Sequence, residues 1–333
     1  MKASDCLAEF RAELIRLRRP SVLGVVVAAA ILCISYSIAF QDAAAWTAGY
    51  HGERLKTLLE QEPSVGQFPG QEDAQQQDNR PNRHEEILSS ITDLTSSRID
   101  LAHIASTQTP LGSLGVSSGL MCSGVGFLAL LFLGAVHVAG EWQRKTIKEF
   151  YRGQGQALGF VLSKFVSLFL MGLVLVIFSW ALLTLWGLVS KRVFPIPFAL
   201  SLVETWHWVY PVLLGLPVVL FFYAALGTAL GILVRDVAGV IVGGATGFLV
   251  LGWLSRLEEV EPFSPPVWIS TYMLSARQTG GGVALLRSLC SDWSPALSTG
   301  QLSGGMAQGL LGGLSVALLV ASWIVLQKSD VMR

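Results

Sequence analysis

The residues best suited to bind a partner form one short polar stretch, 141–152, which lies between two long apolar runs. Aromatic side chains alternate there with charged ones, and an apolar centre with a polar rim is typical of a small protein interface. We therefore expect a short cytoplasmic helix that docks on a partner through Phe150 and Tyr151, with Glu141 orienting the partner or capping the helix. The alternative is an ordinary basic connection between two spans. The residues assigned to docking are Glu141, Trp142, Arg144, Lys145, Thr146, Ile147, Phe150, Tyr151 and Arg152.

A second candidate site lies in the segment 255–303, which begins with acids and prolines and then becomes aromatic and apolar. Apolar side chains this dense would not stay in water, and Trp and Tyr favour the membrane–water interface. We expect short helices at or in the outer leaflet that act as an outer gate. The gate residues are Pro262, Trp268, Tyr272 and Met273.

The chain offers no set of residues suited to catalysis or to metal binding. Its four cysteines lie far apart, without a CxxC pair, and are expected to be free thiols. His137 and His207 each stand alone, without an HExxH motif or a paired acid. No GxxxxGK[ST] loop occurs, so we expect no cofactor in this chain, and any ATP and Mg must be bound by a partner. The formal net charge of zero gives no reason to expect nucleic acid.

The elements that position these residues are predicted to be membrane-spanning helices. Of 333 residues, 52% are hydrophobic and 14% are charged, against about 25% charged in soluble domains. The apolar residues form runs long enough to cross roughly 30 Å of hydrocarbon, where only a helix satisfies its own backbone. We predict an all-α integral membrane protein with six transmembrane helices, at 21–40, 114–139, 157–189, 208–234, 237–254 and 304–326.

Glycines recur at every fourth position in the last two runs, a spacing that lets helices approach closely. They could pack within one subunit or against a second copy. The residues are Gly239, Gly243 and Gly247 and then Gly305, Gly309 and Gly313.

Basic residues predict the orientation. More than half of the Lys and Arg residues lie in the short segments that share one side if the N-terminus is cytoplasmic. By the positive-inside rule both termini are cytoplasmic, in a multi-pass protein of the bacterial inner membrane. The predicted inner segments are an amphipathic interfacial helix at 1–20, the coupling helix at 140–156 and a tail at 327–333.

The outer segments are 41–113, 190–207 and 255–303. The first of them holds nearly half of the acidic residues and is predicted to be a helical extracytoplasmic domain. Two helical patterns, 46–61 and 83–104, flank a Gln-rich stretch at 63–81. The second pattern places Ile87, Ile91, Leu94 and Leu101 on one face.

Three motifs resemble the type 2 ABC exporter permease family. The start, Glu9-Phe10-Arg11-Ala12-Glu13-Leu14 followed by Arg18-Arg19-Pro20, is similar to the start of those permeases. Glu141 with Thr146-Ile147, followed by Gly159 and Lys164, resembles the coupling segment of the family, and Glu261-Pro262-Phe263-Ser264-Pro265 resembles its outer segment. The resemblance implies a permease subunit that pairs with a second permease copy or paralogue, sits in membrane lipid and is powered by a dimer of separate ABC ATPase subunits.

Two other classes compete with this interpretation. A secondary transporter would be expected to carry charges in the middle of its spans, and the span interiors are almost free of charge. A non-transporting membrane module, whose outer domain acts in envelope assembly or signalling, is compatible with the same pattern of spans.

Overall fold

The computed structural model describes residues 105–144, 157–193, 200–254, 263–275 and 303–328, together with Gly24, Ile31, Ser35, Ile38, Ala39 and Ala102. Every regular element among these residues is a helix. The predicted interfacial helix, most of the first span and of the outer domain, and the residues 145–156 lie outside the described part of the chain.

Five helices of the described part are long and apolar enough to cross a membrane, which confirms an all-helical membrane protein. Because the first predicted span lies outside the described residues, the sixth crossing stays a prediction. The five candidate spans are Gly124–Gln143, Ala157–Arg192, Leu202–Val234, Val237–Leu254 and Gly304–Lys328.

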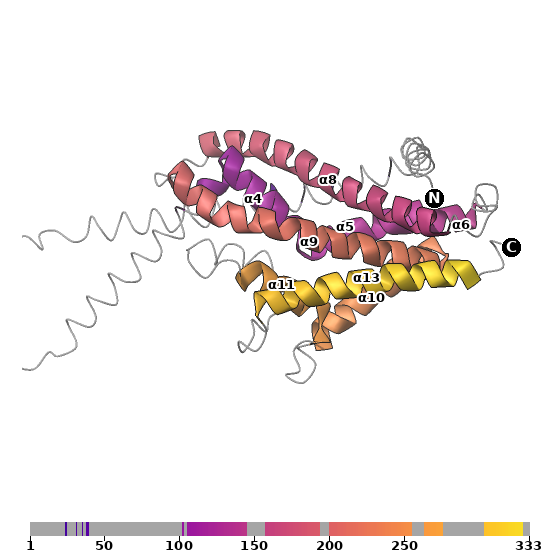
Figure 1. The fold of residues 1–333 in the computed structure, drawn as a ribbon. Helices are drawn as coiled ribbons and strands as arrows, with labels where there is room; N and C mark the ends of the chain where they lie inside the picture. Colours follow the sequence, from indigo (N-terminus) through magenta and orange to yellow (C-terminus); the bar gives the residue numbers. More distant parts are fainter. Residues whose placement is uncertain are drawn as a thin grey trace, which may run out of the picture.

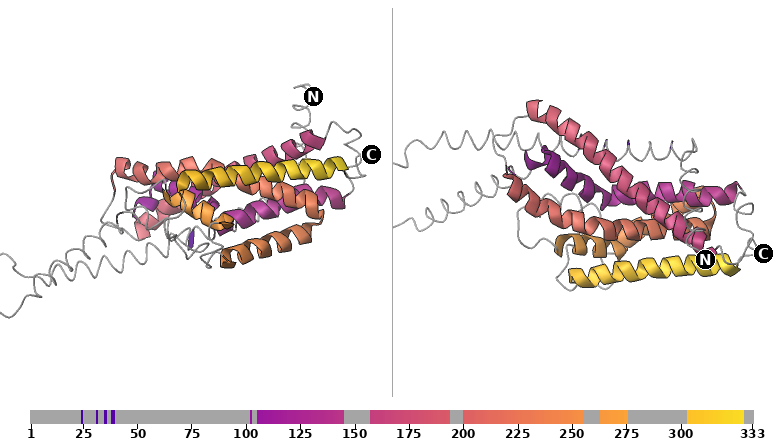
Figure 2. Two further views of the ribbon diagram at one scale, coloured as in Figure 1. Left: turned by 60° about the horizontal axis from the view of Figure 1, so that its bottom comes forward. Right: turned by 45° about the horizontal axis from the view of Figure 1, so that its top comes forward.

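Two long helices organise the bundle (Figure 1). α8 (Ala157–Val193) and α9 (Leu202–Val234) run in opposite directions, and α13 (Gly304–Lys328) lies along α9. α10 (Val237–Leu254) starts beside the end of α9 and diverges from it, as the left view of Figure 2 shows. One end of the bundle gathers α6 (Gly140–Gln143), the start of α8, the turn between α9 and α10, and the end of α13; we call it the junction end and the opposite end the far end.

The helix bounds differ from the predicted ones mainly at the far end. α10 matches its prediction, whereas α8 continues to Val193 and α9 starts at Leu202, well before 208. The early start of α9 has a local cause, because Ser201 and Glu204 form a capping box. The Ser201 hydroxyl accepts from the Glu204 N–H, and the Glu204 carboxylate accepts from the Ser201 N–H at 2.8 Å. The outer loop predicted at 190–207 is therefore shorter than expected.

The span predicted to run unbroken over 114–139 is interrupted at Cys122 and Ser123. It consists of α4 (Pro110–Met121), α5 (Gly124–Gly134), the π-helical turn η2 (Ala135–Ala139) and α6 (Gly140–Gln143). The Ser123 hydroxyl donates to Leu120 O at 2.6 Å and accepts from Val125 N–H, so one side chain ends α4 and starts α5.

The interruption is held in place by Tyr223, from the middle of α9. Its hydroxyl donates to the carbonyl groups at the break, 3.2 Å from Cys122 O and 3.4 Å from Ser123 O, and Ser123 O also accepts from the Phe127 N–H at 3.1 Å. Cys122 is buried and forms no disulfide, as predicted for the cysteines; the other three lie outside the described residues.

α4 fills the space between the far halves of α8 and α9. Its Ser117 hydroxyl donates to Val176 O of α8 at 2.9 Å. A Cβ at Gly115 would lie 2.5 Å from the Trp208 ring of α9, so only glycine allows the two helices to approach this closely.

The four-residue glycine pattern is not used for packing among the described residues. Nothing lies within 4 Å of a Cβ built at Gly243, Gly247, Gly309 or Gly313, because α10 and α13 turn these positions outward. The first glycine of the α10 series is different, since a Cβ at Gly239 would meet Val234 at 2.7 Å.

Candidate coupling junction

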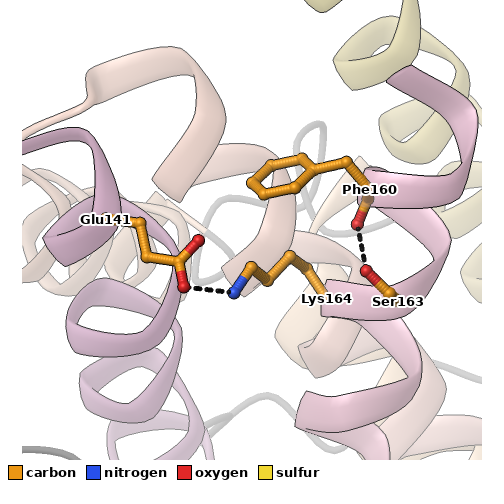
Figure 3. A network of polar contacts seen from close by, with 4 residues as sticks. All are labelled: Glu141, Phe160, Ser163 and Lys164. Carbon is orange, nitrogen blue, oxygen red and sulfur yellow. Dashed lines mark hydrogen bonds and ion pairs between the residues drawn. The ribbon is translucent and has the colours of Figure 1, made fainter. Parts of the chain in front are cut away.

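The predicted docking stretch begins at a buried ion pair. Glu141, in α6, places Oε1 2.9 Å from Lys164 Nζ of α8, and the two side chains are 8% and 0% exposed. Lys164 Nζ lies 5.5 Å from the centre of the Phe160 ring, and the Ser163 hydroxyl donates to Phe160 O at 3.0 Å. Figure 3 shows Lys164 extending from its helix toward Glu141, with the Phe160 ring beside its alkyl chain. Each charge is therefore compensated by the other in surroundings with little water.

Close backbone packing fixes the position of Glu141. A Cβ at Gly134 would lie 3.0 Å from the Cα of Gly227 in α9, and one at Gly231 would lie 2.6 Å from Val138 Cβ. The π-helical turn η2, which separates Gly134 from α6, is thus pressed against α9 along its length. Such turns insert an extra residue into a helix and are frequent at functional sites. The packing of η2 on α9 therefore holds α6 in a fixed position.

The turn between α9 and α10 reaches the same place. Arg235 ends α9 in the left-handed conformation, with φ 61°, and its guanidinium lies 4.2 Å from the centre of the Trp142 ring. Asp236 accepts from Gln143 Nε2 with one oxygen and from the Gly239 N–H with the other, at 2.7 Å for the latter. The turn therefore caps the start of α10 and holds the end of α6 at once.

These contacts join three elements at the point where the chain leaves the bundle. α6 is bound to α8 through Glu141 and to the turn between α9 and α10 through Trp142 and Gln143. A force applied to the residues that follow Arg144 would reach all three elements together. No group of three or more His, Cys, Asp or Glu residues that could hold a metal occurs in the described part of the chain.

The structure describes three of the predicted docking residues, Glu141, Trp142 and Arg144, and they differ in their exposure. Glu141 is buried, so its carboxylate faces Lys164 and does not reach the surface; Trp142 is half-buried beneath Arg235, and Arg144 is exposed. The structure thus gives Glu141 an internal partner in place of the surface role expected for it. The remaining docking residues, Lys145, Thr146, Ile147, Phe150, Tyr151 and Arg152, lie outside the described residues.

The predicted gate residues lie elsewhere, on α11 (Pro265–Ser275), which packs against α9, α10 and α13. Trp268 is 8% exposed and Met273 is 1% exposed. A Cβ at Gly215 of α9 would lie 2.5 Å from Met273 Sδ. Tyr272 is half-buried, and its ring also lies beside Gly215, 3.5 Å from a Cβ built there. The helix is an internal part of the bundle, and Pro262 lies outside the described residues.

Three residues have roles in these sites that the sequence did not predict. Lys164 belongs to the motif that resembles the coupling segment, but its pairing with Glu141 was not predicted, although a lysine inside an apolar run is a signal for a buried partner. Asp236 lies between two apolar runs, and the sequence carries no sign that its carboxylate reaches α6. Tyr223 is one aromatic among many in its span, and nothing in the sequence marks it as the donor to a broken helix.

Comparisons with models of known protein families, with curated protein sequences and with solved structures gave no match for this chain. Its function must therefore be inferred from its own sequence and geometry.

Proposed function

We propose that the chain is the membrane-spanning permease subunit of an ATP-driven ABC exporter, which forms a translocation path with a second permease copy or paralogue and is moved by a separate ATPase dimer. The observation that carries this proposal is the buried ion pair of Glu141 with Lys164. It fixes the helix that enters the polar stretch 145–156 to the helix that leaves it.

The proposal assigns each part of this arrangement a task. The stretch after Arg144 docks on the ATPase through Phe150 and Tyr151, and the junction carries the movement into α8, α9 and α10. The junction end then faces the cytoplasm of a bacterial cell, together with both termini, in agreement with the basic residues of the short segments. ATP and Mg are bound by the ATPase, since this sequence has no phosphate-binding loop.

The break in the second span supports a transport role. Helices interrupted inside the membrane are typical of transporters, where unwound backbone lines a path or allows two halves of a helix to move separately. Here α11 packs against α9, the helix whose Tyr223 hydroxyl donates to the break. We assign α11 to an outer gate whose position depends on this packing.

A secondary transporter is the second candidate, because the same ion pair places two ionisable groups inside the bundle. The pair lies at the junction end, against the start of α8, and not in the middle of a span. An ion-coupled carrier would work without an ATPase, so association with an ATPase separates the two candidates.

The test is co-purification with a candidate ABC ATPase from the same organism. Phe150→Ala combined with Tyr151→Ala is expected to weaken association by about 1 to 3 kcal/mol for each aromatic anchor lost. The matched control is Trp206→Ala, which removes an exposed aromatic from the far end of α9 and should leave association unchanged. If the double variant binds the ATPase as well as the wild-type chain, the docking assignment is wrong.

A further inference from the structure

The exposed apolar side chains of α8 and α9 extend over a greater length than a bilayer can cover. On α9 they run from Leu202 to Val234, about 48 Å at the rise of an α-helix, and on α8 from Leu158 to Val189, about 46 Å. The hydrocarbon core is roughly 30 Å thick. Even if each helix is tilted by about 40°, its row of exposed apolar side chains still extends about 35 Å along the membrane normal. Part of the apolar surface must therefore project beyond the lipid.

That excess lies at the far end, because charges fix the junction end. Val234 is followed directly by Arg235 and Asp236, and α13 ends at Lys328. A crossing of about 20 residues counted from Val234 reaches only Gly215 on α9. The outermost of the uncovered residues form what we call the far-end patch: Leu185, Leu188 and Val189 on α8, and Leu202, Val203 and Trp206 on α9, which are 44% to 77% exposed.

An apolar patch of this kind in water marks a surface that another part of a protein covers. The chain itself supplies a segment that could cover the patch. Ala105 is buried, and the residues after it form hydrogen bonds with both helices that carry the patch. Ser106 Oγ accepts from Trp208 Nε1 of α9 at 3.2 Å, and Gln108 Nε2 donates to Ser190 Oγ of α8 at 3.2 Å. The segment that precedes Ala105 must therefore approach the molecule at the far end.

The sequence of that segment, 83–104, complements the patch. As a helix it would be about 33 Å long, enough to extend over the whole uncovered part of both stripes. Its apolar residues Ile87, Ile91, Leu94 and Leu101 recur at helical spacing and would lie on one face of that helix.

We propose that the segment 83–104 docks as an amphipathic helix on the far-end patch, with Ile87, Ile91, Leu94 and Leu101 against α8 and α9. The outer domain is then attached rigidly to the two longest helices of the bundle. This attachment does not depend on whether the protein is a transporter.

Disulfide cross-linking in native membrane vesicles tests the docking. In a chain whose four native cysteines are replaced by serine, Leu94→Cys is paired with Leu185→Cys or with Val203→Cys. A protease site introduced at Gly155 lies between the two cysteines of each pair, so an intramolecular disulfide keeps the two fragments together on a non-reducing gel. Leu185 and Val203 are 60% and 63% exposed, so their replacement removes no buried contact.

The matched control is Ser96→Cys, which has nearly the same distance along the chain to Ala105 but lies on the opposite face of a helix. We expect several-fold more linked fragment with Leu94→Cys than with Ser96→Cys for at least one partner. Equal yields from the two positions, or no link from either, would overturn the proposal. So would disulfide-linked dimers formed by Leu185→Cys alone, which would show that a second copy covers the patch.

Discussion

Removing the positive charge of Lys164 should destabilise the protein far more than removing an exposed charge. In Lys164→Met the Glu141 carboxylate would stay in its buried place, 8% exposed, without the ammonium group that lies 2.9 Å from it. Breaking a buried pair in this way costs about 3 to 5 kcal/mol, a large part of the 5 to 15 kcal/mol that stabilises a typical protein.

Removing both charges should restore most of this loss. In the double variant Glu141→Met with Lys164→Met no charge remains buried, and apolar replacements of similar volume are often neutral in such sites. We expect a free energy of unfolding within about 1 kcal/mol of the wild type, hence a coupling energy of about 3 kcal/mol or more in the double-mutant cycle. Although folded, the double variant should fail to link ATP hydrolysis to movement of the spans.

The assay is unfolding of the purified protein in detergent micelles at increasing SDS concentration. Lys191→Met, which removes an exposed lysine at the far end of the same helix, is the control and should change nothing. If Lys164→Met is no less stable than Lys191→Met, or if the double variant is as unstable as the single ones, the pair does not hold α6 to α8.

Three further results are expected. Tyr223→Phe removes the hydroxyl that bonds the carbonyls of the broken span, and should lower the free energy of unfolding by about 1 kcal/mol, whereas exposed Tyr210→Phe should not; equal losses would refute the role of Tyr223. Trp268→Ser empties a buried site on α11 and should alter transport while the ATPase still binds; unchanged transport would make α11 a mere spacer. Protease added outside intact spheroplasts should cut within 63–81, and cleavage only in inverted vesicles would reverse the proposed orientation.

The long apolar helices could be predicted from the sequence because their length alone separates a span from a buried strand or loop. The bounds of α10 were predicted correctly, since Arg235 and Asp236 interrupt the apolar pattern just before it. The start of α9 was missed although its signal is local: the Ser201 and Glu204 pair is a readable capping box, and both residues were assigned to a loop.

The break in the second span could not be predicted in the same way. The run 114–139 is mainly apolar and long enough for one continuous span, whereas the interruption depends on the local bonds of Ser123 and on Tyr223, which comes from another helix. The ion pair of Glu141 with Lys164 is similar. Each residue is visible in the sequence, but the distance between them is decided by the packing of η2 on α9, where Gly134 and Gly231 leave no room for a side chain.

Native mass spectrometry of the chain co-expressed with a candidate ABC ATPase from the same organism, and released from detergent micelles, tests the central proposal most directly. A permease powered by a separate ATPase should appear as a complex of two membrane subunits with two ATPase subunits, and the complex should hydrolyse ATP in a vanadate-sensitive manner. Detection of the membrane subunit only by itself or only with further copies of itself, in conditions where the ATPase is folded and binds ATP, would contradict the proposal.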